Sequence, residues 1–195
     1  PSIMTMTESN NLSLPNSLVD QDLVDQNLSD QTANRLAELS SELTKDNGIN
    51  LAKALNPYFR PDANTVVCGA LDNDKVSALA KAGVELVINL QASDELDFDE
   101  AQAVQQAGMA YEHLPIQSAA DLKQLNILAF DKLLRQYHGK KIAMHCATGN
   151  RAGAAMALRA GWLRGRKMDT AMDSGRTHGL TILEEEVRNR LLVPR

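Results

Sequence analysis

The stretch that decides the fold is Lys141-Ile142-Ala143-Met144-His145-Cys146-Ala147-Thr148-Gly149-Asn150-Arg151-Ala152-Gly153. Its apolar beginning predicts a buried strand, and the run of small residues after the arginine predicts a helix. The short loop between them holds one cysteine, one glycine and one arginine. Backbone N–H groups and the dipole at a helix N-terminus favour negative charge, so the loop is a candidate site for an oxyanion.

Each residue of this loop has an expected role. Cys146 is the expected nucleophile, because a thiolate is stabilised in such a position. Arg151 would hold two oxygens in a bidentate fork, and a cation in a first helical turn is otherwise unfavourable. Gly149 allows an amide to turn inward. The other loop residues, which would contribute mainly backbone N–H groups, are Ala147, Thr148 and Asn150. The hydroxyl of Thr148 could also donate a hydrogen bond to the sulfur.

The loop resembles the active-site loop of the cysteine-dependent protein tyrosine phosphatases, written His-Cys-(x)5-Arg-Ser/Thr. Here four residues separate Cys146 from Arg151, and Ala152 occupies the place of the hydroxyl residue. A Cys-(x)4-Arg loop is similar to those of rhodanese sulfurtransferases and of the bacterial beta-lactamase-hydrolase-like phosphatases, a dual-specificity-like branch. Other segments resemble the second group: residues 83–90, 109–116 and 179–181. The resemblance covers about residues 57–193.

The resemblance implies a phosphatase that cleaves a phosphate monoester through a covalent cysteinyl-phosphate. It implies that His145 orients the loop, although a strand histidine could equally be a satisfied core residue. It also places a general acid on the loop after residues 111–116, where Asp121 is the available carboxylate. Asp121 has an alternative role, as the N-cap of the next helix in a capping box with Gln124.

Two departures from the family pattern leave other functions open. The missing hydroxyl at Ala152 would cost one hydrogen bond of about 1–3 kcal/mol and slow turnover about 10–100-fold. The shorter loop would also suit a persulfide on Cys146, as in a rhodanese-like sulfurtransferase, although rhodanese loops usually begin Cys-Arg. A non-catalytic oxyanion-binding domain is the third reading. The substrate would be a phosphorylated small molecule or a phosphoprotein.

The rest of the chain predicts an α/β fold in three layers, with a mainly parallel central sheet flanked by helices. Strands are expected at 65–68, 84–90, 111–116 and 142–146, and helices at 73–81, 97–107, 121–137, 151–163, 168–176 and 181–192. The catalytic loop would lie at the carboxyl ends of the strands. Residues 1–30 are expected to be a polar, flexible tail, 31–56 an N-terminal helical extension, and 57–195 the catalytic domain.

The composition of the chain indicates which classes of binding partner and which cellular compartment to expect. The chain has 195 residues and a net charge of −5, which argues against nucleic-acid and membrane partners. Two cysteines and the lack of a signal-like segment favour the cytoplasm, or the periplasm if a signal peptide has been removed. No set of His, Cys and carboxylate residues has metal-ligand spacing, so we expect no metal or other cofactor. The sequence leaves the oligomeric state open.

Two further features have no role in this scheme. Cys68, near the end of a predicted strand, is either an inert buried thiol or a resolving partner for Cys146. Basic residues gather between positions 159 and 176, where they form either the solvated face of helices or a rim that attracts anions. They are Arg159, Arg164, Arg166, Lys167 and Arg176.

Overall fold

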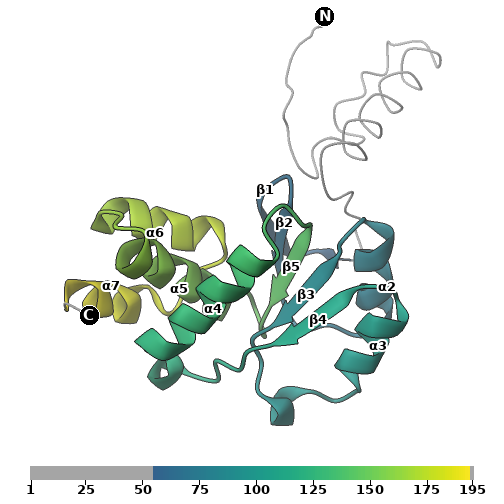
Figure 1. The fold of residues 1–195 in the computed structure, drawn as a ribbon. Helices are drawn as coiled ribbons and strands as arrows, with labels where there is room; N and C mark the ends of the chain where they lie inside the picture. Colours follow the sequence, from purple (N-terminus) through teal and green to yellow (C-terminus); the bar gives the residue numbers. More distant parts are fainter. Residues whose placement is uncertain (1–54, 194–195) are drawn as a thin grey trace, which may run out of the picture.

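Four parallel strands and one antiparallel strand form the central sheet, in the order β1-β2-β5-β3-β4 (Figure 1). The computed structural model describes residues 55–193, so the predictions for the tail and for nearly all of the helical extension lie outside the described residues. The three-layer α/β prediction is confirmed. The strands are β1 (Tyr58–Asp62), β2 (Thr65–Cys68), β3 (Leu86–Asn89), β4 (Ala110–His113) and β5 (Ile142–His145).

Strand β5 lies in the middle of the sheet because it can be buried on both faces. All of its residues are buried, as are those of its neighbour β3. Such strands are continuous apolar runs rather than alternating ones, which is the pattern seen in this sequence. The parallel register aligns Cys68, His145 and Asn89 across the sheet. Cys146, the next residue after β5, therefore lies at the carboxyl edge of the sheet.

Helices cover both faces of the sheet (Figure 1). On one face α2 and α3 bury Val76, Leu79 and Val104 against the strands. On the other face α4 to α7 pack around a larger core that includes Phe130 and Leu158. The helices are α2 (Asn73–Lys81), α3 (Glu100–Gln106), α4 (Gln124–Gln136), α5 (Asn150–Leu158), α6 (Met168–Thr177) and α7 (Glu184–Leu192).

Glycines allow α5 and α6 to approach each other closely. A Cβ at Gly153 would lie 2.7 Å from the carbonyl oxygen of Gly175 and would also collide with the backbone of Leu180. A Cβ at Gly175 would lie 2.8 Å from that of Ala157. Because backbone atoms yield little, this contact fixes the position of α5, and with it the loop from which α5 begins.

Several element predictions were wrong in existence or in extent. The hairpin strand β1 was missed, and the strand predicted over 111–116 ends at His113. The helices predicted from residues 97, 121 and 181 each begin three residues later, at Glu100, Gln124 and Glu184. The helix expected over 151–163 is α-helical only to Leu158 and continues as a π-helix, η6 (Arg159–Leu163). Gly161 in that segment allows the Leu191 side chain of α7 to approach. No described helix is long and apolar enough to cross a membrane.

Candidate active site

The loop after β5 closes on the thiol of Cys146. Cys146 is fully buried, and the backbone N–H of Gly149 donates to its Sγ at 3.0 Å. Gly149 has φ of +94°, a left-handed conformation that other residues adopt at a cost, and it precedes the first residue of α5. The sulfur therefore lies at the N-terminus of α5 with an amide directed at it. Thr148 and Ala147 are exposed at the tip of the loop.

Neighbouring segments hold the outside of the loop. The carbonyl oxygen of Ala147 accepts a hydrogen bond from the N–H of Ala70 at 3.2 Å, and a Cβ at Gly69 would lie 2.7 Å from that oxygen. The side chain of Asn150 accepts from the N–H groups of Thr181 at 2.9 Å and Leu183 at 3.2 Å. Asn150 therefore ties the segment before α7 to the catalytic loop, a role that the sequence analysis did not assign.

Arg151 pairs with a carboxylate that the sequence analysis missed. Its Nη1 and Nη2 donate to the two oxygens of Glu95 at 2.9 and 2.7 Å, and Nη1 also donates to the carbonyl oxygen of Ile116 at 3.0 Å. Glu95 ends the short helix η4 (Ser93–Glu95) in the loop after β3. Hydrogen bonding from Arg151 lowers the pKa of Glu95 to about 2, so this carboxylate is ionised at neutral pH.

A buried polar pair lies behind Cys146, on the preceding residue of the chain and on α3. Nε2 of His145 is 2.6 Å from Oε2 of Glu100, and both side chains are fully buried. The other oxygen of Glu100 has no partner in residues 55–193. On the next strand, Asn89 donates to the hydroxyl of Tyr111 at 2.9 Å, and burial raises the pKa of that tyrosine. His145 is thus held by a carboxylate from α3, which fixes its ring beside the loop.

The carboxylate of Asp121 is bound within its own turn. Its Oδ2 accepts from the N–H groups of Gln117 at 2.8 Å and Ser118 at 3.4 Å. The N-cap of α4 is instead Lys123, which makes no side-chain capping bond, so the predicted capping box with Gln124 is wrong. Ser118 is the N-cap of a separate short helix, η5 (Ala119–Asp121), and Asp121, the last residue of that helix, binds amides that precede it.

The remaining candidates of the sequence analysis have ordinary environments. Burial raises the pKa of the Cys68 thiol to about 12, which favours the inert reading over a resolving thiol. His113 contacts the carbonyl oxygen of Gln91. Nδ1 of His178 lies 2.7 Å from the carbonyl oxygen of Ser174. Among residues 55–193, no three His, Cys, Asp or Glu side chains are grouped as a metal site.

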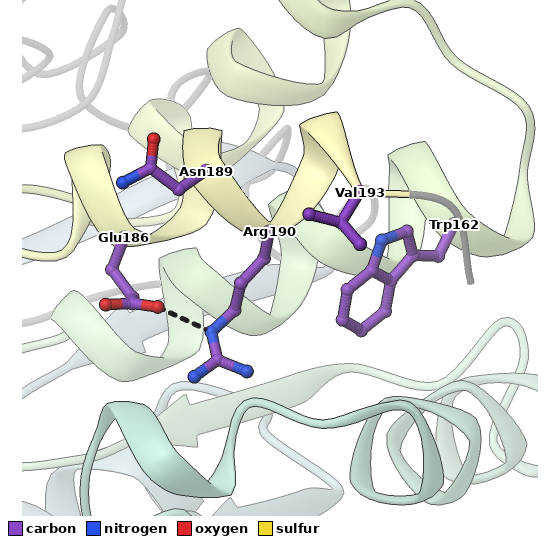
Figure 2. Close-up of a pocket in the computed structure, with 5 residues that line it drawn as sticks. All are labelled: Trp162, Glu186, Asn189, Arg190 and Val193. Carbon is purple, nitrogen blue, oxygen red and sulfur yellow. Dashed lines mark hydrogen bonds and ion pairs between the residues drawn. The ribbon is translucent and has the colours of Figure 1, made fainter.

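The hollow drawn in Figure 2 lies away from this loop. It has a volume of about 380 Å³, and none of its lining residues belongs to the catalytic loop. Arg190 in this hollow donates to Glu186 at 2.8 Å and to the carbonyl oxygen of Leu122 at 2.8 Å. Its charge is therefore already balanced. The lining residues are Trp162, Glu186, Asn189, Arg190 and Val193.

The five-stranded, mainly parallel sheet with helices on both faces, and with a cysteine and an arginine on the loop after its central strand, matches the fold of the tyrosine phosphatase-like proteins. Comparison with known proteins agrees at this level. No protein-family model matches the chain, and no curated protein matches it significantly. Solved structures do match, and those compared below are named as phosphatases or as candidate phosphatases.

Three of these solved structures illustrate the likeness. A candidate phosphatase of the DUF442 group from Shewanella putrefaciens CN-32 is 23% identical, over 71% of this chain and 93% of that chain, with a TM-score of 0.56. Tk-PTP in its active form is 22% identical, and the match covers 70% of this chain and 96% of Tk-PTP, with a TM-score of 0.54. Kinase-associated phosphatase, solved with its catalytic-site cysteine substituted, is 16% identical. The match covers 76% of this chain and 98% of that phosphatase, with a TM-score of 0.50. At these identities the likeness establishes the fold, which is the tyrosine phosphatase-like fold that the sequence predicted.

Proposed function

We propose that this protein hydrolyses a phosphate monoester with Cys146 as nucleophile and Arg151 as the main phosphate ligand. The observation that carries the proposal is the directed amide of Gly149, 3.0 Å from Sγ, with Arg151 in the first turn of the helix that follows. The structurally similar proteins include phosphatases, one of which has a catalytic-site cysteine. The substrate is a phosphorylated small molecule or a phosphoprotein.

The free donors of Arg151 fit this role. A guanidinium carries five N–H groups, and three of them are used: two on Glu95 and one on Ile116. The two that remain, on Nε and Nη2, form one edge of the planar group. That edge matches two oxygens of a phosphate in a bidentate contact. Glu95 can therefore hold the arginine while the phosphate binds, and neither anion has to displace the other.

The proposed reaction has two steps. The Cys146 thiolate attacks phosphorus, the S–P bond forms, and the P–O bond to the leaving group breaks as that oxygen takes up a proton. Water then attacks phosphorus and gives a proton back to the group that protonated the leaving oxygen, the S–P bond breaks, and inorganic phosphate leaves as the thiolate is restored. Arg151 and the amides of residues 147–150 stabilise the charge on the phosphoryl oxygens in both steps. Ala152, which is buried in α5, supplies no hydroxyl for the second step.

Asp121 is the proposed proton donor to the leaving oxygen. Glu95, the carboxylate bound to Arg151, is a poor donor because its pKa of about 2 leaves it ionised at neutral pH. To act, Asp121 must exchange its contacts with the Gln117 and Ser118 amides for the leaving group. Asp121→Asn should then reduce turnover of phenyl phosphate, a poor leaving group, about tenfold more than that of 4-nitrophenyl phosphate. Equal losses on both substrates would remove Asp121 from this role.

Paired assays on one preparation test the proposal as a whole. The full chain is given 4-nitrophenyl phosphate in one assay, and thiosulfate with cyanide in the other. Phosphate release that is lost in Cys146→Ser, and kept in the matched variant Cys68→Ala, supports the phosphatase. Sulfur transfer without phosphate release would overturn it in favour of the sulfurtransferase. Activity in neither assay would leave an oxyanion-binding domain as the function.

A further inference from the structure

The basic residues that follow α5 line a second hollow, at the end of that helix away from the catalytic loop. The hollow has a volume of about 340 Å³. Arg151 and Arg159 are eight residues apart, so the two ends of the helix are separated by about 12 Å. The hollow is lined mainly by Met156, Arg159, Arg164, Arg166, Thr170 and Ser174, and we call it the arginine hollow.

One buried carboxylate beside the arginine hollow is shared by three arginines. The side chain of Asp131, on α4, is only 7% exposed. Its Oδ1 accepts from Arg159 Nε at 2.8 Å and from Arg164 Nη2 at 2.6 Å, and its Oδ2 accepts from Arg135 Nε at 2.8 Å. Burial opposes ionisation of Asp131, but these arginines outweigh it and lower its pKa. One negative charge therefore faces three positive charges.

The arginine hollow has hydrogen-bond donors to spare. Arg159 and Arg164 each use a single nitrogen on Asp131, and their other N–H groups have no partner in the described part of the chain. The Arg166 side chain forms no ion pair or hydrogen bond there either. Thr170 and Ser174 add two hydroxyl groups from successive turns of α6. This donor set suits the three terminal oxygens of a phosphate.

The hollow of Figure 2 gives a comparison within the same molecule. The two hollows are similar in volume, at about 380 and 340 Å³. In the first, one arginine is matched by one glutamate (Figure 2) and also donates to a backbone carbonyl. In the arginine hollow, Asp131 leaves an excess of positive charge, although the chain as a whole has a net charge of −5. The π-helix η6, which contributes Arg159, is a form often found at functional sites.

We propose that the arginine hollow binds the phosphate group of a small molecule, separately from the catalytic loop. Its volume lies at the lower end of the range of ligand pockets, which is about 300–1,000 Å³, so it fits a small ligand rather than a polymer. Met156 supplies an apolar wall. The phosphate binds to the free guanidinium donors, with Arg166 as a ligand that has no other task.

Calorimetric titration with tripolyphosphate tests the proposal. The full chain carries Arg151→Ala throughout, which weakens anion binding at the catalytic loop. We expect the Arg151→Ala variant to bind tripolyphosphate at one site. Adding Arg166→Ala should weaken this affinity at least tenfold, whereas adding Arg188→Ala should leave it unchanged. Arg188 is the matched control, because it is an exposed arginine on α7 outside the hollow.

Two results would overturn the proposal. The first is no binding of tripolyphosphate to the Arg151→Ala variant, and the second is equal affinity of the two double variants that add Arg166→Ala or Arg188→Ala to it. Arg166 is exposed and its side chain has no described partner, so its loss should not unfold the protein. Circular dichroism of each variant checks this. All titrations are run at one ionic strength, so that general screening of charge does not produce the difference.

Discussion

The two ends of helix α5 hold arginines and carboxylates in different proportions. At its beginning, Arg151 meets Glu95 one to one, with two parallel hydrogen bonds of 2.9 and 2.7 Å. Beyond its end, Asp131 meets Arg135, Arg159 and Arg164. The first carboxylate holds one arginine in a fixed orientation. The second is saturated by three guanidinium groups.

This difference indicates what each centre can do. A matched carboxylate fixes the direction of the arginine's unused N–H groups, as catalysis requires of a transition-state ligand. An outnumbered carboxylate ties elements together, here α4 to the segment after α5, and leaves positive charge over. The orientation of the arginine is therefore the important property of the Arg151–Glu95 centre. Excess positive charge is the important property of the centre around Asp131. The predictions below separate the two.

The largest effect is expected from Arg151→Lys. Lysine keeps the charge but loses the planar fork, so kcat/KM for 4-nitrophenyl phosphate should fall about 100–1,000-fold. Arg159→Lys, the matched change at the other end of α5, should alter kcat/KM less than twofold. Steady-state kinetics of the two variants side by side make the comparison. Similar losses in both would mean that the two centres do not differ in the way proposed.

Asp131→Asn should have the next largest effect, on stability rather than activity. It leaves three arginines around a neutral amide, so the free energy of unfolding should fall by about 2 kcal/mol. Urea denaturation measures this loss. Turnover should stay within twofold of the parent, because Asp131 does not contact the catalytic loop. A loss of activity without a loss of stability would place Asp131 in the catalytic machinery instead.

Glu95→Gln tests whether the matched carboxylate positions Arg151 or blocks it. An amide retains the shape but accepts with only one oxygen, so Arg151 should become less fixed and kcat/KM should fall about tenfold. The fall should appear mainly in kcat. A rise in kcat/KM would show that Glu95 competes with phosphate for the arginine. In that case the free edge of the guanidinium would not be the phosphate site.

Local signals in the sequence predicted much of the fold and the strand, loop and helix around Cys146. Strand β2 and helix α2 have the predicted bounds, because Asp72 caps the helix and Gly83 follows its end. The strand, loop and helix around Cys146 are likewise contiguous in the chain. The hairpin strand β1 was missed because it contains Pro61 and, with no buried residue, lacks an apolar pattern. Its turn is closed by a hydrogen bond from the N–H of Asn64 to Asp62 at 2.8 Å.

Two carboxylates of the site, Glu95 and Glu100, were not predicted, because their contacts are distant in sequence. Glu95 lies 56 positions from Arg151, and Glu100 lies 45 positions from His145. Both contacts depend on β3 lying beside β5, and the strand order is not contained in the periodicity of either strand. One signal was present: both carboxylates follow β3, whose carboxyl end meets that of β5 at one edge of a parallel sheet.

The smallest effect is expected from acid. Glu95 has a folded-state pKa of about 2 because Arg151 hydrogen-bonds to it, whereas a glutamate in an unfolded chain has a pKa of about 4.3. A lowered carboxylate pKa adds stability above the unfolded value, and that contribution is lost as pH falls toward the folded value. The difference in unfolding free energy between the parent and Glu95→Gln should therefore be constant above about pH 5 and shrink toward pH 2. Since Asp131 titrates in both proteins, its effect cancels in this difference. A difference that does not change between pH 5 and 2 would mean that Arg151 does not depend on the charge of Glu95.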